Sequence, residues 1–246
     1  MEYDKDSFAR SGYYEVLPES KDCVAIDLGF SIDHAALVVM EKLKLPIPVE
    51  QGGVGVDLRQ KLRDPIYVIR RIIEFPQRTP HAQVIEVARP ANLTIRARDE
   101  MGQPVDKKIP KAERVVDVTG AQSFRELAKE KGFEFTPLTI TAGGFDTQSR
   151  DPHDGSDRAS KARLVSEVDA ALATRDLILP DDIEGAQTLI DQLNAFRLKR
   201  SATTGAPTWG DTGGVHDDVL LATAYALRAL RSTRGNAWNV SAFPFA

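Results

Sequence analysis

Short apolar segments rich in β-branched residues alternate with amphipathic helical segments along most of this chain. The first two apolar segments, residues 22–27 and 35–41, are separated by a short turn and predict an antiparallel hairpin. Later apolar segments are followed by helical patterns, an order typical of parallel strands with covering helices. The chain is therefore expected to form an α/β fold, a mixed sheet with antiparallel first strands, flanked by helices.

The remaining elements are bounded by recognisable end signals. Gly132 stands where a helix C-cap belongs, and Ser160 precedes a helix with apolar residues at 3.6 spacing. Residues 98–111 are polar and contain two prolines, which indicates an exposed loop. Further strands are predicted at residues 65–75, 114–118 and 133–141, and helices at 81–93, 119–131, after Ser160, on a stripe from Leu189 to Phe196, and at 217–231. Pro90 should end or kink the helix at 81–93.

Length and composition fit one large domain. The 246 residues are 42% hydrophobic and 28% charged, as in ordinary globular proteins. The domain is predicted at residues 21–232, with a lead-in at 1–20 and a tail at 233–246. Cys23 is the single cysteine, so an intramolecular disulfide is excluded and a reducing cytoplasm is favoured. No apolar run approaches the roughly 18 residues of a membrane span, and the first residues carry no secretion signal.

The charge is unevenly distributed. The net charge of −4 does not indicate a nucleic-acid-binding protein, yet residues 61–114 hold 12 Lys and Arg against 7 Asp and Glu. Such a region could face phosphates, and a solvated surface is an equally good explanation. The side chains predicted to contact DNA are Arg70, Arg71, Arg96, Arg98 and, at the start of a later helix, Lys161.

Three sets of acids stand at the ends of predicted elements. Asp27 ends the first strand, Asp117 ends a later strand, and Asp217 and Asp218 begin the last helix. A single aspartate in such a place often caps a turn, and a buried carboxylate is costly unless its charge is balanced. Three that converge on one sheet edge predict a divalent cation site, because hard cations prefer carboxylate oxygens.

The helical wheel separates the two adjacent acids. Asp218 shares its face with uncharged residues that include Ala222 and Tyr225, whereas Asp217 shares its face with Arg228. Asp218 is therefore the predicted metal ligand. Asp217 is expected to cap the helix, to assist a ligand or to be a further ligand, and His216 could be a ligand or a structural residue.

These residues resemble the nuclease domain of phage terminase large subunits. The resemblance rests on Asp27-Leu28-Gly29 with Asp33, on the run from Val115 to Gly120, and on His216-Asp217-Asp218 before an Ala- and Leu-rich helix. It spans residues 23–230 and implies an RNase H-like fold. It also implies two Mg²⁺ or Mn²⁺ ions and endonucleolytic cutting of double-stranded DNA during genome packaging. The catalytic residues it implies are Asp27, Asp117 and Asp218; the metal ligands are these three and Asp217, with Asp117 as the bridging carboxylate.

Terminase large subunits also carry an ATPase motor, which this sequence lacks. No Gly-x-x-x-x-Gly-Lys-[Ser/Thr] phosphate loop is present, and the glycines of residues 52–55 have no following lysine. The chain is therefore expected to be an excised nuclease domain or a separate subunit. The resemblance implies a packaging ATPase domain or subunit, the portal and the small terminase subunit as partners, in the cytoplasm of a bacterial host.

Two other readings remain open. Ile26-Asp27-Leu28-Gly29 also resembles the phosphate-binding hairpin of actin, sugar kinases and heat-shock ATPases, which need a second lobe and a second glycine-rich hairpin. Holliday-junction resolvases share the fold but are typically shorter and more basic. A catalytically silent docking module of a packaging motor is the non-enzymatic alternative, and for it metal binding would be irrelevant.

Overall fold

The computed structural model describes residues 19–29, 34–44, 64–89, 92–98, 104–141, 157–200, 207–211 and 216–232. The helices are α2 (His81–Ala88), α3 (Gln122–Glu130), α4 (Lys161–Ala173), α5 (Ala186–Ala195) and α6 (Asp218–Arg231). The strands are β1 (Glu19–Asp27), β2 (Ala36–Lys44), β3 (Ile66–Glu74), β4 (Thr94–Arg98), β5 (Pro104–Lys108), β6 (Glu113–Asp117), β7 (Thr136–Thr141), β8 (Asp157–Ser160), β9 (Leu177–Ile178), β10 (Phe196–Arg200) and β11 (Pro207–Asp211).

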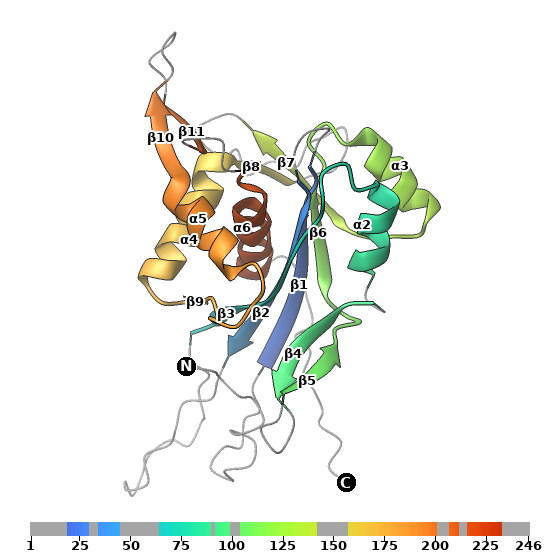
Figure 1. The fold of residues 1–246 in the computed structure, drawn as a ribbon, viewed down its shortest axis with the longest axis horizontal. Coiled ribbons are helices and arrows are strands. Elements are labelled where there is room, and N and C mark those ends of the chain that lie inside the picture. The colour runs from blue at the N-terminus through green and yellow to red at the C-terminus, as the bar shows by residue number, and fades with distance from the viewer. Residues whose placement is uncertain are drawn as a thin grey trace, which may run out of the picture.

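Seven of these strands form one mixed sheet in the order β8-β7-β6-β1-β2-β3-β9. Strand β2 is antiparallel to both its neighbours, and the other strands all run parallel to β1. Helices α4, α5 and α6 cover one face of the sheet, and α2 and α3 cover the other (Figure 1). The expected mixed sheet with antiparallel first strands, the RNase H-like arrangement, is confirmed.

Alternation along β1 divides the apolar residues between two cores. Cys23 and Ala25 belong to the core beneath α4, α5 and α6, whereas Val24 and Ile26 belong to the core beneath α2 and α3. Successive side chains of a strand point to opposite faces, so a strand buried on both sides reads as a continuous apolar run. Cys23 is fully buried, as its apolar surroundings require.

Both predicted end signals are confirmed. The Ser160 hydroxyl accepts a hydrogen bond from the Arg163 amide at 3.3 Å and caps α4. After α3, Gly132 adopts a left-handed φ of 61°, which glycine tolerates without steric cost. The Phe133 amide then donates to the Ala128 carbonyl at 2.8 Å, which completes a Schellman motif.

The helix predicted from His81 ends just before Pro90, one of the two outcomes expected there. Helix α2 stops at Ala88, because Arg89 precedes Pro90 and is extended, with a ψ of 135°. Two other predicted elements are corrected. The loop expected at residues 98–111 is wrong: β4 and β5 pair there as an antiparallel ribbon. Phe196, expected on the stripe of α5, begins β10 instead.

Several sequence features lie outside the described residues: Asp33, the glycines of 52–55, the lead-in up to residue 18 and the tail from 233. Within the part of the chain that is described, no helix is long and apolar enough to cross a membrane.

Candidate active site

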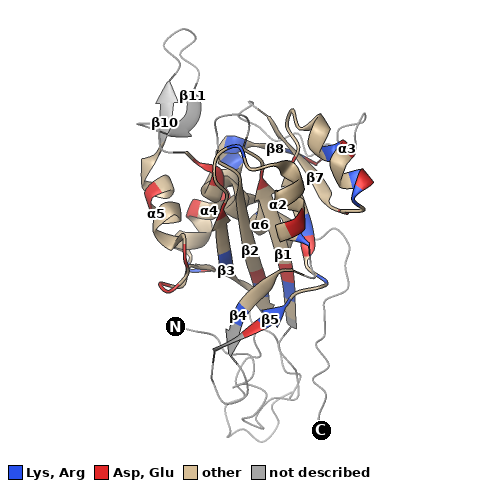
Figure 2. Cartoon of the chain, turned by 45° about the vertical axis from the view of Figure 1, so that its right-hand side comes forward, with Lys and Arg blue, Asp and Glu red and all other residues tan. Residues whose placement is uncertain are grey.

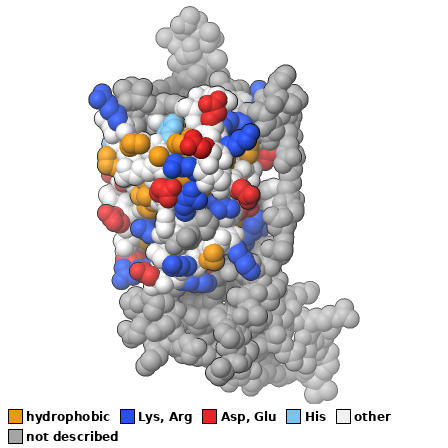
Figure 3. Space-filling model, turned by 90° about the vertical axis from the view of Figure 1, so that its right-hand side faces the viewer, with side chains coloured by type: hydrophobic (Ala, Val, Ile, Leu, Met, Phe, Trp, Pro, Cys, Tyr) orange, Lys and Arg blue, Asp and Glu red, His pale blue; other side chains and the backbone are white. Residues whose placement is uncertain are grey.

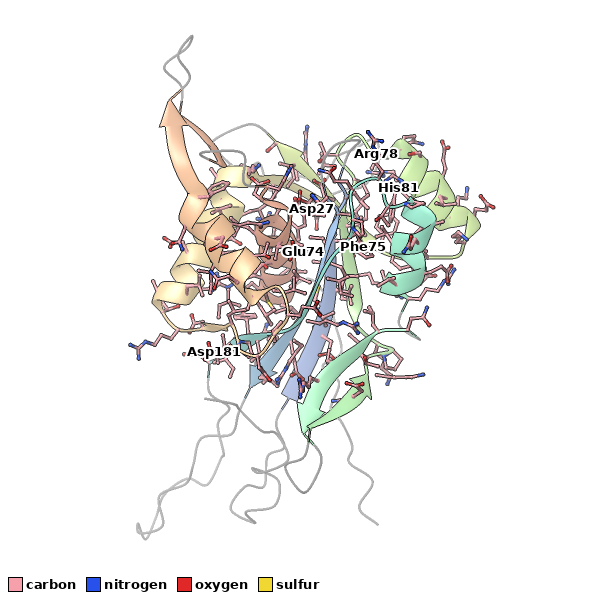
Figure 4. The ribbon with its side chains drawn as sticks, viewed as in Figure 1. Asp27, Glu74, Phe75, Arg78, His81 and Asp181 are labelled. Atoms are coloured by element: carbon pink, nitrogen blue, oxygen red, sulfur yellow. The ribbon has the colours of Figure 1, made fainter. Side chains whose placement is uncertain are left out.

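The carboxyl ends of the parallel strands meet at one edge of the sheet. Neighbouring strands β1 and β6 end there with Asp27 and Asp117. From β1 the sheet extends through β2 and β3 on one side and through β6 and β7 on the other, so the strand order reverses between β1 and β6. Ligands of open α/β sheets bind at such a point of reversed strand order. Asp27 lies at the same end of the molecule as Arg78 and His81, and Asp181 lies toward the opposite end (Figure 4).

Strand alternation also fixes the face to which the two acids belong. Asp27 follows Cys23 and Ala25 on β1 at intervals of two residues, and Asp117 follows Val115 on β6. These three apolar residues belong to the core beneath α6. Asp27 and Asp117 therefore face α6, and they are only 7% and 8% exposed.

Tyr225 of α6 joins the two acids. Its hydroxyl lies 3.4 Å from Asp27 Oδ1 and 3.3 Å from Asp117 Oδ2. Burial, followed by the charges of Asp27 and Asp117, raises the pKa of Tyr225 well above its usual value, so the phenol stays protonated and donates. The wheel placed Tyr225 on the face of Asp218, but its contact with the other two acids was not predicted.

Thr119 orients Asp117 from the turn that follows β6. Its amide and its hydroxyl both donate to Asp117 Oδ1, at 2.8 Å and 2.6 Å. The hydroxyl in turn accepts from the Ile140 amide of β7 at 2.7 Å, which leaves its proton for the carboxylate. The sequence indicated Thr119 as part of a helix start and of the run from Val115 to Gly120, but its hydrogen bonds to Asp117 were not predicted.

The two acids at the start of α6 have different environments. Asp218 is the first residue of the helix and is 8% exposed. Asp217 is at the N-cap position without a side-chain capping bond, and its Oδ2 lies 2.5 Å from Lys161 Nζ. The expectation that Asp217 caps the helix through its side chain is therefore wrong, because that carboxylate pairs with Lys161.

The acids influence one another electrostatically. Burial raises the pKa of Asp27 well above its usual value, and the charges of Asp117, Asp218 and Asp217 add to the rise in that order. Burial also raises the pKa of Asp117, against the hydrogen bonds from Thr119 and Tyr225. Lys161 lowers both values. The site thus concentrates carboxylates whose ionised forms are costly without a compensating cation.

This donor set fits a hard divalent cation in its chemistry. Carboxylate oxygens from β1, β6 and α6 are the ligands that such ions prefer. In the described ranges, however, no three or more Asp, Glu, His or Cys side chains are already arranged as a complete ligand set. His216 is exposed and lies at the rim, edge-on to His34 with ring centroids 5.4 Å apart.

Of the five cations predicted to contact DNA, Lys161 lies beside the acids. The others are in different surroundings: Arg70 is paired with Glu41 at 2.8 Å, Arg71 donates to the Thr94 carbonyl at 3.3 Å, and Arg96 is exposed on β4, toward the end of the sheet opposite Asp27 (Figures 1 and 4). The side chain of Arg98 lies outside the described set.

Among the described residues the two charge signs are mixed. Lys and Arg positions are interspersed with Asp and Glu positions along the described helices and strands (Figure 2). The face that carries α2 and α3 likewise mixes both signs (Figure 3). The acids and the neighbouring Lys161 are therefore the features that indicate where DNA would bind.

The fold is similar to that of known phage enzymes. The crystal structure of the large terminase nuclease from thermophilic phage G20c matches with a TM-score of 0.51 and 18% identity, over 85% of this chain and 82% of that chain. The g2p (large terminase) nuclease domain from the bacteriophage SPP1 with bound Mn matches with a TM-score of 0.45 and 12% identity, over 85% and 86%. No protein-family model and no curated protein matches the sequence. The predicted resemblance is confirmed at the level of the fold, which this chain shares with the large terminase nuclease of phage G20c.

Proposed function

We propose that this protein is a metal-dependent endonuclease that cuts double-stranded DNA during phage genome packaging. The observation that carries the proposal is the meeting of Asp27 and Asp117 at the switch point of the sheet, joined by one buried hydroxyl. Asp218 adds a third buried carboxylate from α6. The shared fold with a terminase nuclease supports the substrate class, and the acids support the chemistry.

In this proposal Asp27, Asp117 and Asp218 hold two Mg²⁺ or Mn²⁺ ions, with Asp217 as a further candidate ligand. Bound divalent ions supply the charge that activates a water and stabilises the leaving oxygen of a phosphodiester. Asp117 would be the carboxylate common to both ions, and Thr119 fixes its orientation through two hydrogen bonds to Oδ1. A fixed carboxylate needs less reorganisation when the ions and the substrate bind.

Lys161 is the proposed contact with the DNA backbone near the acids. Its ammonium pairs with Asp217 in this structure and is about one-third exposed, with a side-chain exposure of 32%. A phosphate contact of this kind gives affinity without base recognition. A packaging ATPase domain or subunit, the portal and the small terminase subunit are the proposed partners that bring the DNA to the site.

A plasmid assay tests the proposal. The protein should nick and linearise supercoiled DNA with Mn²⁺ or Mg²⁺ and should be inactive in EDTA, with Asp27→Asn as the matched inactive control. Cleavage should show little sequence preference, so several plasmids should be cut at similar rates. Cleavage that persists in EDTA, or that strictly requires ATP, would contradict the proposal.

A titration with Mn²⁺ separates the remaining readings. A silent docking module should bind the ion weakly or not at all, and it should be inactive on every DNA. An ATPase lobe should instead bind ATP and magnesium together. Binding of Mn²⁺ that is lost in both Asp27→Asn and Asp218→Asn is the outcome expected for the nuclease.

A further inference from the structure

Tyr225 is a buried polar residue on the helix that carries Asp218. It lies seven residues, about two turns, after that acid and therefore on the same face of α6. Its side chain is 1% exposed and belongs to the core beneath α4, α5 and α6. A phenylalanine would fill the same apolar volume, so the hydroxyl itself calls for an explanation.

The hydroxyl contacts one oxygen of each of two carboxylates. Its distances of 3.4 Å to Asp27 and 3.3 Å to Asp117 are nearly equal. A phenol carries a single proton, so it shares that proton between the two acceptors or donates to one of them at a time. Tyr225 is thus a neutral donor held in common by two groups of like charge.

The two carboxylates depend on this donor to different degrees. Asp117 also accepts two hydrogen bonds from Thr119, both at Oδ1. For Asp27, Tyr225 is the donor found among the residues that the structure describes, and it acts on Oδ1. Removing the hydroxyl should therefore affect Asp27 more than Asp117.

We propose that Tyr225 is a positioning residue for the metal ligands. From the buried side of the site its hydroxyl holds one oxygen of Asp27 and one of Asp117, which sets the orientation of both carboxylates before an ion binds. This inference rests on the proposed metal site. Partners that orient metal ligands typically contribute about 10–100-fold to metal affinity, and this is the range expected for Tyr225.

The test is Mn²⁺ binding by Tyr225→Phe, measured by calorimetry and by the loss of the free-ion electron paramagnetic resonance signal. The Kd should rise about 10–100-fold while the melting temperature in EDTA stays close to that of the wild type. Tyr67→Phe is the matched control. Tyr67 is also a buried tyrosine, 4% exposed, but it lies under the guanidinium of Arg231, at 5.4 Å and at the far end of α6. The Kd of Tyr67→Phe for Mn²⁺ should equal that of the wild type.

The outcomes distinguish this inference from the proposed function. If the wild type does not bind Mn²⁺, the metal site itself is wrong. If the wild type binds and Tyr225→Phe binds equally well, the positioning role is overturned and the metal site stands. Should Tyr225→Phe fold poorly, a variant with Tyr3, Tyr13, Tyr14 and Tyr67 all changed to phenylalanine leaves Tyr225 as the single tyrosine. The ultraviolet difference spectrum of this variant on addition of Mg²⁺ then decides: a tyrosine signal supports the role, and its absence overturns it.

Discussion

Lys161 and Asp217 form an ion pair that joins the first residue of α4 to the residue before α6, with Nζ and Oδ2 2.5 Å apart. In this pair the ammonium group of Lys161 balances the negative charge of Asp217. Asp218, by contrast, is buried and raises the pKa of Asp27 more strongly than Asp217 does. The two adjacent acids thus have different surroundings.

Asp218→Asn should abolish cleavage, whereas Asp217→Asn should leave substantial activity. Asp218 is buried at the first position of α6, whereas the carboxylate of Asp217 pairs with Lys161, so the two acids are not equally available to one ion. The loss in Asp218→Asn should exceed the roughly 100-fold upper range for residues that only orient a ligand. Single-turnover cleavage of a labelled duplex measures both variants. An active Asp218→Asn protein would reverse the assignment.

Asp27→Asn should stabilise the protein in EDTA at neutral pH. Burial and the neighbouring carboxylates raise the pKa of Asp27 above its unfolded value. Between the two values the folded state binds more protons, so the free energy of unfolding falls as pH rises. The advantage of the variant should therefore be present at neutral pH and should shrink as pH falls toward the ordinary aspartate range. Urea titrations across pH test this, and a variant no more stable than the wild type at neutral pH would contradict it.

Thr119→Val should lower the rate of cleavage by about 10–100-fold, because Asp117 loses the hydroxyl that orients Oδ1. It should also cost about 1 kcal/mol of stability, since the Ile140 amide loses its acceptor. Thr119→Ser keeps the hydroxyl and should retain most of the activity. A valine variant as active as the wild type would show that the hydroxyl does not orient Asp117.

Arg70→Ala should act on stability. Arg70 and Glu41 form a buried ion pair, with side-chain exposures of 13% and 2%, and breaking such a pair costs about 3–5 kcal/mol. The double variant Arg70→Met/Glu41→Leu should recover most of the loss, because it removes both charges together. Urea unfolding measures the three proteins. A stable Arg70→Ala protein with weakened DNA binding would support the phosphate contact predicted from the sequence.

Lys161→Ala should weaken DNA binding and reduce its dependence on salt. Each phosphate contact on duplex DNA contributes about 0.9 to the slope of log affinity against log salt concentration. Fluorescence anisotropy in an Asp218→Asn background avoids cleavage during the measurement. Lys129→Ala, which removes an exposed lysine from α3, is the control and should leave the slope unchanged.

Much of the fold could be predicted because its central strands are buried on both faces. Such strands read as uninterrupted apolar runs, and those ending at Asp27 and Asp117 were located to within a few residues. Helix ends with a local cause, at Gly132 and Ser160, were also predicted, since their hydrogen bonds involve residues nearby in the sequence.

The remaining features depend on contacts between distant residues. Strands β4 and β5 form because they pair with each other, and their composition is polar rather than apolar. The sequence therefore predicted a loop at this position. The hydroxyl of Tyr225 meets carboxylates 198 and 108 residues away. A helical wheel identifies the face to which Tyr225 belongs, but not which residues lie opposite.

The separation of the core into two layers has a consequence for how this protein can change. The cluster containing Val84, Phe124 and Phe133 lies across the sheet from the core that Asp27 and Asp117 face. Substitutions at these three positions change the packing of α2 and α3 and replace no residue of the core that the two acids face. The outer layer of α2 and α3 can thus diverge, or be redesigned for attachment to another protein, while the acids on the other face are kept.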